Sequence, residues 1–193
     1  LGNRGAWGKS VMYEEAACVP MIVSGPDVPV GHTVKTPATI VDIYPFIMDC
    51  VGARDQTTVP DDNPGTSIMN LINGDEPCRV AFSEYHAMGS KTAAYMVRKG
   101  HYKLIYYPAY PAQVFNLEAD PDELVDLTDD PDAQSIKAEL MAELSKICDP
   151  VLVDQSAKST QARMVDENGG KPAIIERGDL GFSVPPGVAP MFD

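Results

Sequence analysis

AAYMVRKGHYKLIYY, residues 93–107, is the stretch that decides the fold of the second half of this chain. Its two halves, 93–98 and 102–107, are rich in aromatic and aliphatic side chains, which is typical of β-strands. Lys99 and Gly100 separate them, and a short connection that contains glycine favours a tight turn between antiparallel strands. The stretch therefore predicts a β-hairpin.

Further strands flank this hairpin, at residues 79–85 before it and 113–117 after it. Together the four strands predict a small antiparallel sheet, which can leave one face in contact with solvent. A helix is expected to begin at Asp130-Pro131, because apolar residues then recur at helical spacing. These residues are Ile136, Leu140, Leu144 and Ile147. Since each element must bury its apolar side, we expect the helix to pack across the sheet.

The segments around these elements are less regular. Residues 19–24 form a short apolar run, closed by the turn residues Gly25-Pro26, that predicts a strand. Residues 53–78 are rich in Asp, Pro, Gly and Asn, which is typical of a surface loop. Residues 149–193 are expected to form an irregular, extended tail. The predicted domains are therefore the end of a larger core at 1–78, a small α+β subdomain at 79–148 and the tail at 149–193.

A helix is expected between the first strand and the long loop. Thr36 and Pro37 suit its N-cap and first helical position, and Gly52 suits its end. Pro45 lies inside the helix and should kink it. Apolar residues recur along one side, which predicts a stripe buried in the core. The stripe consists of Ile40, Ile43, Ile47 and Val51.

Composition and charge narrow the classes of function. With 193 residues, of which 44% are hydrophobic, the chain can bury a core. Its formal net charge of -13 argues against nucleic acid as a partner, because a phosphate backbone is recognised by basic side chains. The same charge argues against binding to anionic membrane surfaces. No apolar run is long enough to predict a transmembrane helix, so no membrane partner is expected.

The four cysteines are far apart and match no zinc-binding spacing. They are Cys18, Cys50, Cys78 and Cys148. Buried, reduced thiols are expected, and a disulfide pair in an oxidising compartment is the alternative. Reduced thiols are consistent with a cytoplasmic location, while a periplasmic or secreted location is left open.

The first twenty residues, LGNRGAWGKSVMYEEAACVP, resemble a motif of the sulfatase family in the alkaline-phosphatase superfamily. In that motif a glycine-rich loop leads through a lysine, here Lys9, and a Tyr-Glu pair, here Tyr13-Glu14, to Val-Pro and an apolar strand. A metal-binding Asp-His or Asp-Asn pair lies just upstream in the family. The resemblance therefore implies the C-terminal portion of an enzyme whose catalytic half precedes this chain.

Two later stretches resemble the same family. Residues 41–52, VDIYPFIMDCVG, are similar to a sulfatase helix, and residues 98–127 follow the family's pattern of R-x-G-x-x-K-x-I and D-P-x-E. The positions that match this pattern are Arg98, Gly100, Lys103, Phe115, Leu117, Asp120, Pro121, Glu123 and Leu127. The resemblance covers residues 1–148, and RGAWGK, SEYHAMG and the proline-rich end favour its choline-sulfatase-like branch.

The resemblance implies an α/β fold: the C-terminal part of an alkaline-phosphatase-like sandwich, followed by a small antiparallel sheet with a packed helix. It also implies hydrolysis of sulfate esters by a formylglycine nucleophile, with a divalent metal (Ca, Mg or Mn) as cofactor. Formylglycine is made from the cysteine of Cys-x-Pro-x-Arg. Cys18 and Pro20 begin such a pattern, but Ile22 stands where arginine is needed. Nucleophile and metal ligands are therefore expected outside this chain.

Lys9 is the candidate catalytic residue. A fixed ammonium stabilises the negative charge of a sulfate ester and of its leaving oxygen, and the resemblance implies that Lys9 contacts the sulfate group. Trp7 is a candidate for the wall of the substrate pocket, where its ring would suit a quaternary ammonium group. Tyr13 and Glu14 are candidates for fixing the loop, with Glu14 accepting hydrogen bonds from backbone or from a basic neighbour. The alternatives are a solvent lysine and an ordinary amphipathic turn.

His86 is a second candidate substrate contact, because a histidine between a strand and a glycine loop can line a pocket and donate to a leaving group. The alternative is a half-buried structural histidine. Residues 118–132 contain eight carboxylates, but they lack the glycine of a calcium-binding EF-hand loop. We therefore expect a surface turn there and no metal site in this chain.

The sequence thus predicts the C-terminal portion of a sulfatase that is inactive without its other part. A phosphonate monoester or phosphodiester hydrolase of the same superfamily is one alternative. A noncatalytic fragment that only packs against a partner is another. The expected partners are a small sulfate ester, the N-terminal half of the enzyme and further copies of the chain in a homo-oligomer.

Overall fold

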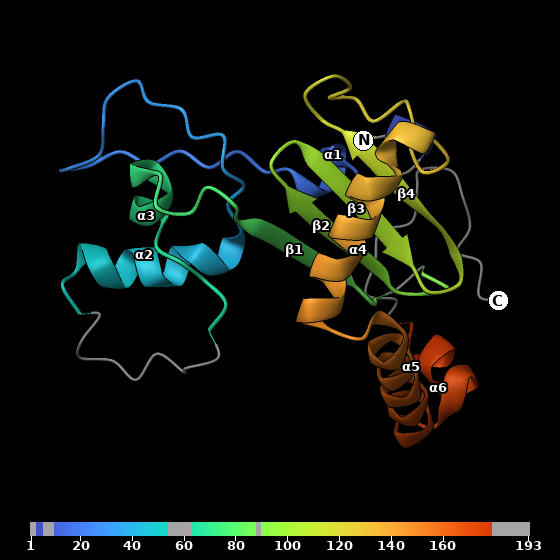
Figure 1. The fold of residues 1–193 in the computed structure, drawn as a ribbon. Coiled ribbons are helices and arrows are strands. Elements are labelled where there is room, and N and C mark those ends of the chain that lie inside the picture. Colours follow the sequence, from blue (N-terminus) through green and yellow to red (C-terminus); the bar gives the residue numbers. More distant parts are fainter. Residues whose placement is uncertain (1–2, 6–9, 54–62, 88–89, 179–193) are drawn as a thin grey trace.

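The computed structural model describes residues 3–5, 10–53, 63–87 and 90–178. Figure 1 shows a sheet with a helix lying across it, short helices to one side beyond strand β1 (Val80–Tyr85), and further helices that follow in the chain. The predicted small antiparallel sheet with a packed helix is confirmed. The division of the chain at residues 78 and 148 stays a prediction.

The sheet contains four antiparallel strands in the order of the sequence, β1-β2-β3-β4. Their bounds are Val80–Tyr85 (β1), Ala94–Lys99 (β2), Tyr102–Tyr107 (β3) and Tyr110–Asn116 (β4). The hairpin between β2 and β3 turns at Gly100, whose φ of 59° is favourable for glycine. Its register pairs Val97 with Leu104, and both side chains are fully buried.

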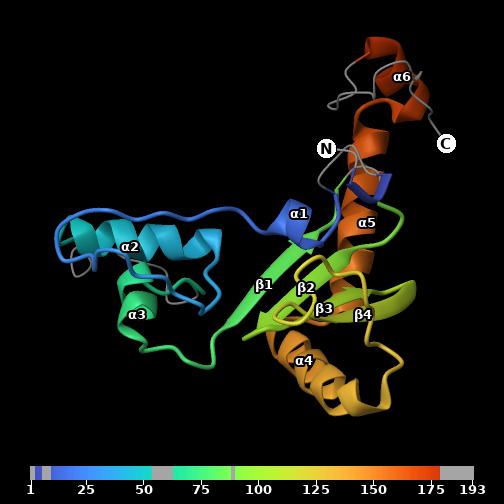
Figure 2. The ribbon, with the colours of Figure 1, turned by 90° about the horizontal axis from the view of Figure 1, so that it is seen from above.

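Both faces of the sheet are covered, because side chains alternate between them. On one face, Tyr95, Val97 and Leu104 pack beneath Leu140 and Leu144 of helix α4 (Gln134–Ile147). On the other face, the buried side chains Met96, Ile105 and Phe115 pack with Met12 from the N-terminal segment. Figure 2 shows α4 and the short helix α1 (Glu14–Ala17) on opposite sides of the sheet. The sheet therefore carries the N-terminal segment on the face away from α4.

Two helices form the other part of the fold: one begins later than the sequence indicates, and the other lies within the predicted loop at 53–78. The turn η2 (Ile40–Asp42) runs into α2 (Ile43–Cys50), and Thr39 rather than Thr36 is its N-cap. Pro45 does not kink α2, because it lies in the first turn, where backbone N–H groups have no acceptor within the helix. A short helix, α3 (Ile68–Asn73), packs against α2.

The predicted strand at residues 19–24 is wrong, since this run has no regular structure. A strand needs a neighbour for its backbone hydrogen bonds. The sheet that the structure describes contains only β1 to β4, so residues 19–24 have no such neighbour.

The predicted burial of the α2 stripe is also wrong in this structure. Its members lie on the outside of the molecule as exposed side chains: Ile40, Ile43, Ile47 and Val51. Within the described residues, α3 packs against α2 without burying this stripe. The stripe has the apolar spacing of a buried helix face, but no element among the described residues covers it.

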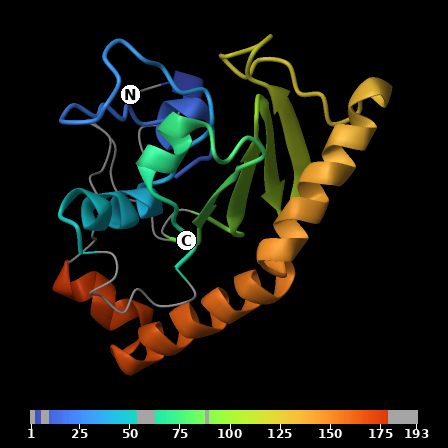
Figure 3. The ribbon, with the colours of Figure 1, turned by 60° about the vertical axis from the view of Figure 1, so that its left-hand side comes forward.

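The predicted extended tail is wrong for residues 150–177. They form α5 (Pro150–Glu167) and α6 (Gly170–Arg177), and Figure 3 shows these helices continuing from the end of α4 away from the sheet. The Asp149 carboxylate caps α5 by accepting hydrogen bonds from the amides of Val151 and Leu152. Asp149-Pro150 was thus a helix-start signal, but no apolar stripe follows it. The remainder of the predicted tail, residues 179–193, lies outside the described residues.

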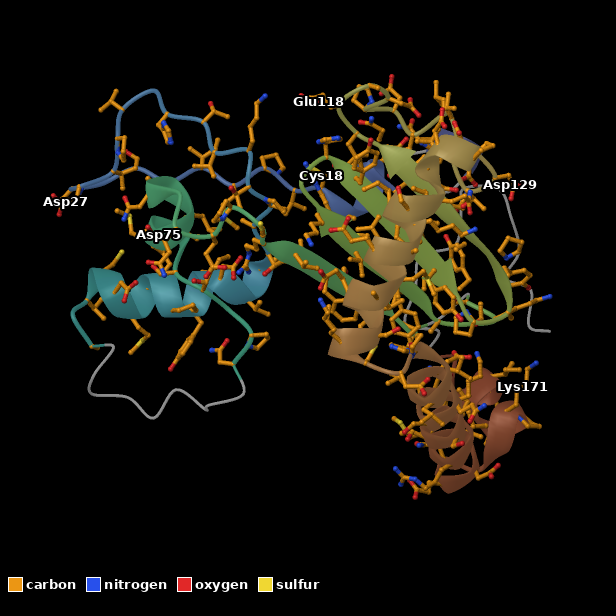
Figure 4. All side chains as sticks on the ribbon, in the orientation of Figure 1. Cys18, Asp27, Asp75, Glu118, Asp129 and Lys171 are labelled. Atoms are coloured by element: carbon orange, nitrogen blue, oxygen red, sulfur yellow. The ribbon has the colours of Figure 1, made fainter. Side chains whose placement is uncertain are left out.

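All four cysteines are free thiols in this structure, and the expected burial is wrong for three of them, Cys78 included. Cys18, labelled in Figure 4, and Cys50 are exposed. Cys18 directly precedes the run at 19–24 and Cys50 lies in α2, and no element among the described residues covers that run or the α2 stripe. Cys148 is half-buried, and burial raises the pKa of its thiol.

Among the described residues, no helix is long and apolar enough to cross a bilayer.

Candidate functional site

The candidate site is the N-terminal segment, whose residues 10–17 lie on the face of the sheet away from α4. Lys9 and Trp7 lie outside the described residues, but the chain on both sides of them is described. The turn η1 (Asn3–Gly5) precedes them, and α1 (Glu14–Ala17) follows. The contacts that can be described for this site are therefore those of the two flanking segments, residues 3–5 and 10–17.

A charged cluster attaches α1 to the sheet. Lys103 of β3 is fully buried at 0% exposure, and its Nζ donates to Oε1 of Glu14 at 2.8 Å. The same Nζ lies 2.8 Å from Oε1 of Glu123, which is 2% exposed. A buried ammonium is costly unless carboxylates surround it, and here two of them do. Arg98 adds a longer ion pair to Glu14, at 3.5 Å.

Glu123 occupies a constrained position in the loop after β4. Its backbone has a φ of 51°, and a residue other than glycine in this left-handed region costs about 1–2 kcal/mol. The turn is held by Asp120, whose carbonyl accepts from the Glu123 amide and whose carboxylate accepts from the Val125 amide. The carboxylate of Glu123 points inward, and its Oε2 accepts a 2.6 Å hydrogen bond from the backbone amide of Glu14.

Arg4 attaches the other flank to the same loop. Its guanidinium donates to the carbonyl oxygens of Asp122 and of Glu123, the latter at 3.2 Å. It also pairs with Glu15 at 3.2 Å. A backbone hydrogen bond, together with the charge of Arg4, lowers the pKa of the Glu15 carboxyl. Arg4 is thus fixed by three oxygen-bearing partners.

Tyr13, in the downstream flank, contacts both Arg4 of the upstream flank and the apolar face of the sheet. The Arg4 guanidinium lies over its ring at 4.0 Å, an attractive cation–π geometry. The ring meets the edge of Phe115, and its hydroxyl donates to Gln113 at 3.0 Å. Tyr13 and Glu14 are therefore brought together with basic neighbours, as a role in fixing the loop requires. That role itself stays a prediction.

His86 lies elsewhere, just after β1. Its ring packs edge-on against Tyr95, with 5.4 Å between centroids, and its Nε2 lies 3.2 Å from Oε2 of Glu84. Gln161 of α5 donates to its backbone carbonyl. Tyr95 belongs to the core beneath α4, so His86 contacts the face opposite to α1. These contacts favour the structural alternative, and a substrate contact by His86 stays a prediction.

The acidic run, residues 118–132, forms a loop beside the sheet. Glu118 and Asp129, labelled in Figure 4, lie near its two ends. Several of its carboxylates accept hydrogen bonds from backbone amides, among them Asp126, which binds the amides of Val114 and Thr128. The predicted surface turn is thus observed, except that Glu123 is buried. No group of three or more His, Cys, Asp or Glu within the described residues could hold a metal ion.

A family comparison decides what this arrangement belongs to. The family model described as "N-sulphoglucosamine sulphohydrolase, C-terminal" matches residues 2–149, which include both flanks and the whole sheet. This chain belongs to that sulfatase family. The resemblance indicated by the first twenty residues is thereby confirmed.

Individual relatives show what this sulfatase domain is similar to. Choline-sulfatase of Rhizobium meliloti (strain 1021) is 34% identical over 142 residues, which cover 74% of this chain and 27% of the relative. Arylsulfatase K of Danio rerio is 34% identical over 121 residues, which cover 60% of this chain and 23% of the relative. The crystal structure of a putative sulfatase from Bacteroides thetaiotaomicron is 27% identical, covers 54% of this chain and 23% of that one, and has a TM-score of 0.46. The chain spans about a quarter of the length of these proteins.

Sequence reasoning placed Lys103 and Glu123 in the motif of this sulfatase domain but assigned them no role. One signal could have found Lys103: it shares a strand face with Ile105 and Tyr107, so it is a lone charge on an apolar face. Such a charge needs a buried partner of opposite sign. Glu123 gave no comparable signal, because its burial depends on a turn that only the folded loop shows.

Proposed function

We propose that this chain is the C-terminal portion of a sulfatase that hydrolyses small sulfate esters, and that Lys9 contacts the sulfate group. The observation that carries the proposal is the family match over residues 2–149, which includes Lys9 and its flanks. The names of the relatives, a choline-sulfatase and an arylsulfatase, support a sulfate ester as substrate. Both occur among the relatives, so the choline-sulfatase-like branch stays a prediction.

The chemistry proposed for this chain is charge stabilisation. The Lys9 ammonium would face the oxygens of the sulfate group, whose negative charge shifts to the leaving oxygen during hydrolysis. Tyr13 and Glu14 would hold the segment in place, and Trp7 would line the pocket. An ammonium held in a fixed direction stabilises developing charge without a cost of reorganisation at the moment of reaction.

A divalent metal and a formylglycine nucleophile are implied by the family resemblance, but the residues at hand do not fit either group. No metal-binding cluster occurs in the described part of the chain, and none of the four cysteines lies in a Cys-x-Pro-x-Arg segment. We propose that the remaining part of the enzyme supplies both. The N-terminal part of the enzyme would therefore be the partner with which this chain forms the active site.

The proposal predicts a difference between the whole enzyme and this chain. The full-length enzyme should hydrolyse 4-nitrophenyl sulfate, whereas the 193-residue chain should hydrolyse none and bind divalent metal no better than an unrelated acidic protein. The reason is that the sequence contains no Cys-x-Pro-x-Arg segment and the described residues contain no metal-binding cluster. Absorbance of released nitrophenolate and calorimetric metal titration measure the two properties.

Each alternative function has its own outcome in the same assays. A full-length enzyme that cleaves an aryl phosphonate monoester faster than the aryl sulfate would support the phosphonate hydrolase. Tight, stoichiometric metal binding by the 193-residue chain would contradict the assignment of the metal site to the rest of the enzyme. A full-length protein inactive on every ester would support the noncatalytic alternative.

We also propose that His86 contacts the substrate, and a substitution in the full-length enzyme tests this directly. Its Nδ1 is buried and has no hydrogen-bond partner among the described residues, so the known contacts of His86 leave one ring nitrogen without an assigned role. His86→Ala in the full-length enzyme should then change the ranking of substrates, with little effect on activated esters whose leaving group needs no proton. Initial rates on an alkyl and an aryl sulfate measure the ranking. Equal losses on both, with a lower melting temperature, would establish the structural role against Tyr95.

We also propose that the full-length enzyme forms a homo-oligomer and that it is located in the cytoplasm. The homo-oligomer is to be tested by light scattering of the full-length enzyme. The cytoplasmic location is to be tested by fractionation of cells that produce it.

A further inference from the structure

The two flanks of the segment that contains Lys9 meet at one residue, Glu123. From the upstream side, the Arg4 guanidinium binds the carbonyl oxygen of Glu123 at 3.2 Å. From the downstream side, the Glu14 amide binds its carboxylate at 2.6 Å. Arg4 and Glu14 are far from Glu123 in sequence but separated from each other only by residues 5–13. Glu123 therefore connects the two ends of a short segment.

The attachment is built from buried groups rather than from flexible surface contacts. Glu123 is held in the left-handed backbone region, with a φ of 51°, and its side chain is fully buried. Lys103, itself completely buried, lies 2.8 Å from the carboxylates of both Glu123 and Glu14. A strained, buried residue persists only where its surroundings hold it, and such residues are concentrated at functional sites.

We propose that Glu123, with Lys103 as its counter-ion, is the positioning residue that fixes both flanks of the segment containing Lys9. Fixing the two ends of a short segment lowers, in general, the entropic cost of orienting a group that the segment carries, and this links the anchor to the role proposed for Lys9. Glu123 touches no reacting atom in this scheme and acts through Arg4 and Glu14. The catalytic part of the inference rests on the proposed role of Lys9, whereas the anchoring part does not.

The chain offers a matched control on the other face of the sheet. Lys99 of β2 also pairs with two glutamates, Glu139 and Glu143 of α4, at 2.7 and 3.0 Å. This ion-pair group has the same composition as the group around Lys103 but contacts neither flank of the N-terminal segment. Glu143→Gln is therefore the control for Glu123→Gln, and both remove one carboxylate charge with little change of shape.

The first measurement is hydrogen–deuterium exchange of the full-length enzyme, followed by mass spectrometry of the peptide that contains residues 10–17. Glu123→Gln should speed exchange in this peptide about tenfold, since the Glu14 amide loses a charged acceptor, while the β2–β3 peptides stay protected. Glu143→Gln should leave the peptide unchanged. If Glu123→Gln fails to fold, Glu123→Asp gives the test instead, because it keeps the charge beside Lys103 but shortens the side chain that reaches the Glu14 amide.

The second measurement is a double-mutant cycle on 4-nitrophenyl sulfate. Glu123→Gln should lower kcat about tenfold, because a small misplacement of a catalytic group has a large effect on rate. In the Lys9→Ala background the same change should have almost no further effect, since the group to be positioned is gone. A general loss of structure would instead lower the rate equally in both backgrounds.

The outcomes separate this inference from the proposed function. Unchanged exchange at residues 10–17, or equal rate losses with and without Lys9, would overturn the positioning role. A wild-type enzyme without sulfatase activity would overturn the proposed function and the catalytic part of the inference. Faster exchange in that inactive protein would still establish Glu123 as the anchor of the two flanks.

Discussion

Replacing Lys9 with alanine in the full-length enzyme is expected to lower turnover of 4-nitrophenyl sulfate about 10²–10³-fold, the usual cost of losing one preorganised charge-stabilising contact. The melting temperature should stay the same, because the contact proposed for Lys9 is with the substrate rather than with the rest of the fold. Steady-state kinetics and differential scanning calorimetry measure the two effects. The loss should appear in kcat more than in KM if the ammonium acts mainly in the transition state.

Lys35 is a suitable control for this prediction. It is an exposed lysine in the connector before α2, and Lys35→Ala removes the same charge from the protein. This variant should keep normal kinetics. A Lys9→Ala variant with normal turnover and normal melting would show that Lys9 is a solvent lysine and that sulfate binding depends on other groups.

Replacing Ile47 with aspartate is expected to leave the 193-residue chain as stable as before but to abolish soluble, active full-length enzyme. Ile47 is 50% exposed in this structure, so an aspartate there meets water. In the whole enzyme, we propose that the rest of the catalytic domain covers the stripe of Ile40, Ile43, Ile47 and Val51. Burying one aliphatic side chain stabilises by about 1.5–3 kcal/mol, and a buried, unpaired carboxylate reverses the sign of that contribution.

Ile147 provides the matched control for the stripe. It is the same residue type at nearly the same exposure, 46%, but it ends α4 in the C-terminal subdomain. Ile147→Asp should leave both the chain and the full-length enzyme soluble. Yield after centrifugation and chemical denaturation of each variant give the comparison. Equal behaviour of Ile47→Asp and Ile147→Asp in the full-length enzyme would mean that α2 faces solvent there too.

Local patterns predicted the sheet and α4 well, because each of these elements packs against or pairs with another one that is near it in sequence. Strands β1 to β4 are consecutive in sequence and pair with their neighbours, so alternation and the turn at Gly100 were enough to place them. Helix α4 was predictable for a similar reason, since Leu140 and Leu144 find their core in the adjacent sheet.

Other elements were predicted incorrectly where a local rule depended on something distant. The run at 19–24 has strand composition but no described neighbouring strand, and the α2 stripe has core spacing but no described covering element. Helix α5 was missed for the opposite reason: it has a capping signal at Asp149 but no apolar stripe, because most of its side chains face solvent.

The sequence alone determined the family, the antiparallel sheet with its helix, and the candidacy of Lys9, Tyr13 and Glu14, because these follow from residues near one another along the chain. Only the tertiary structure decided which residues support them. Glu123 lies more than a hundred residues after Glu14, and its role requires a left-handed turn, the burial of Lys103 and the packing of α1 on one particular face of the sheet. The physical reason is that a buried charge is stable only beside its counter-charge. Which charges become neighbours is determined by the packing of the whole chain.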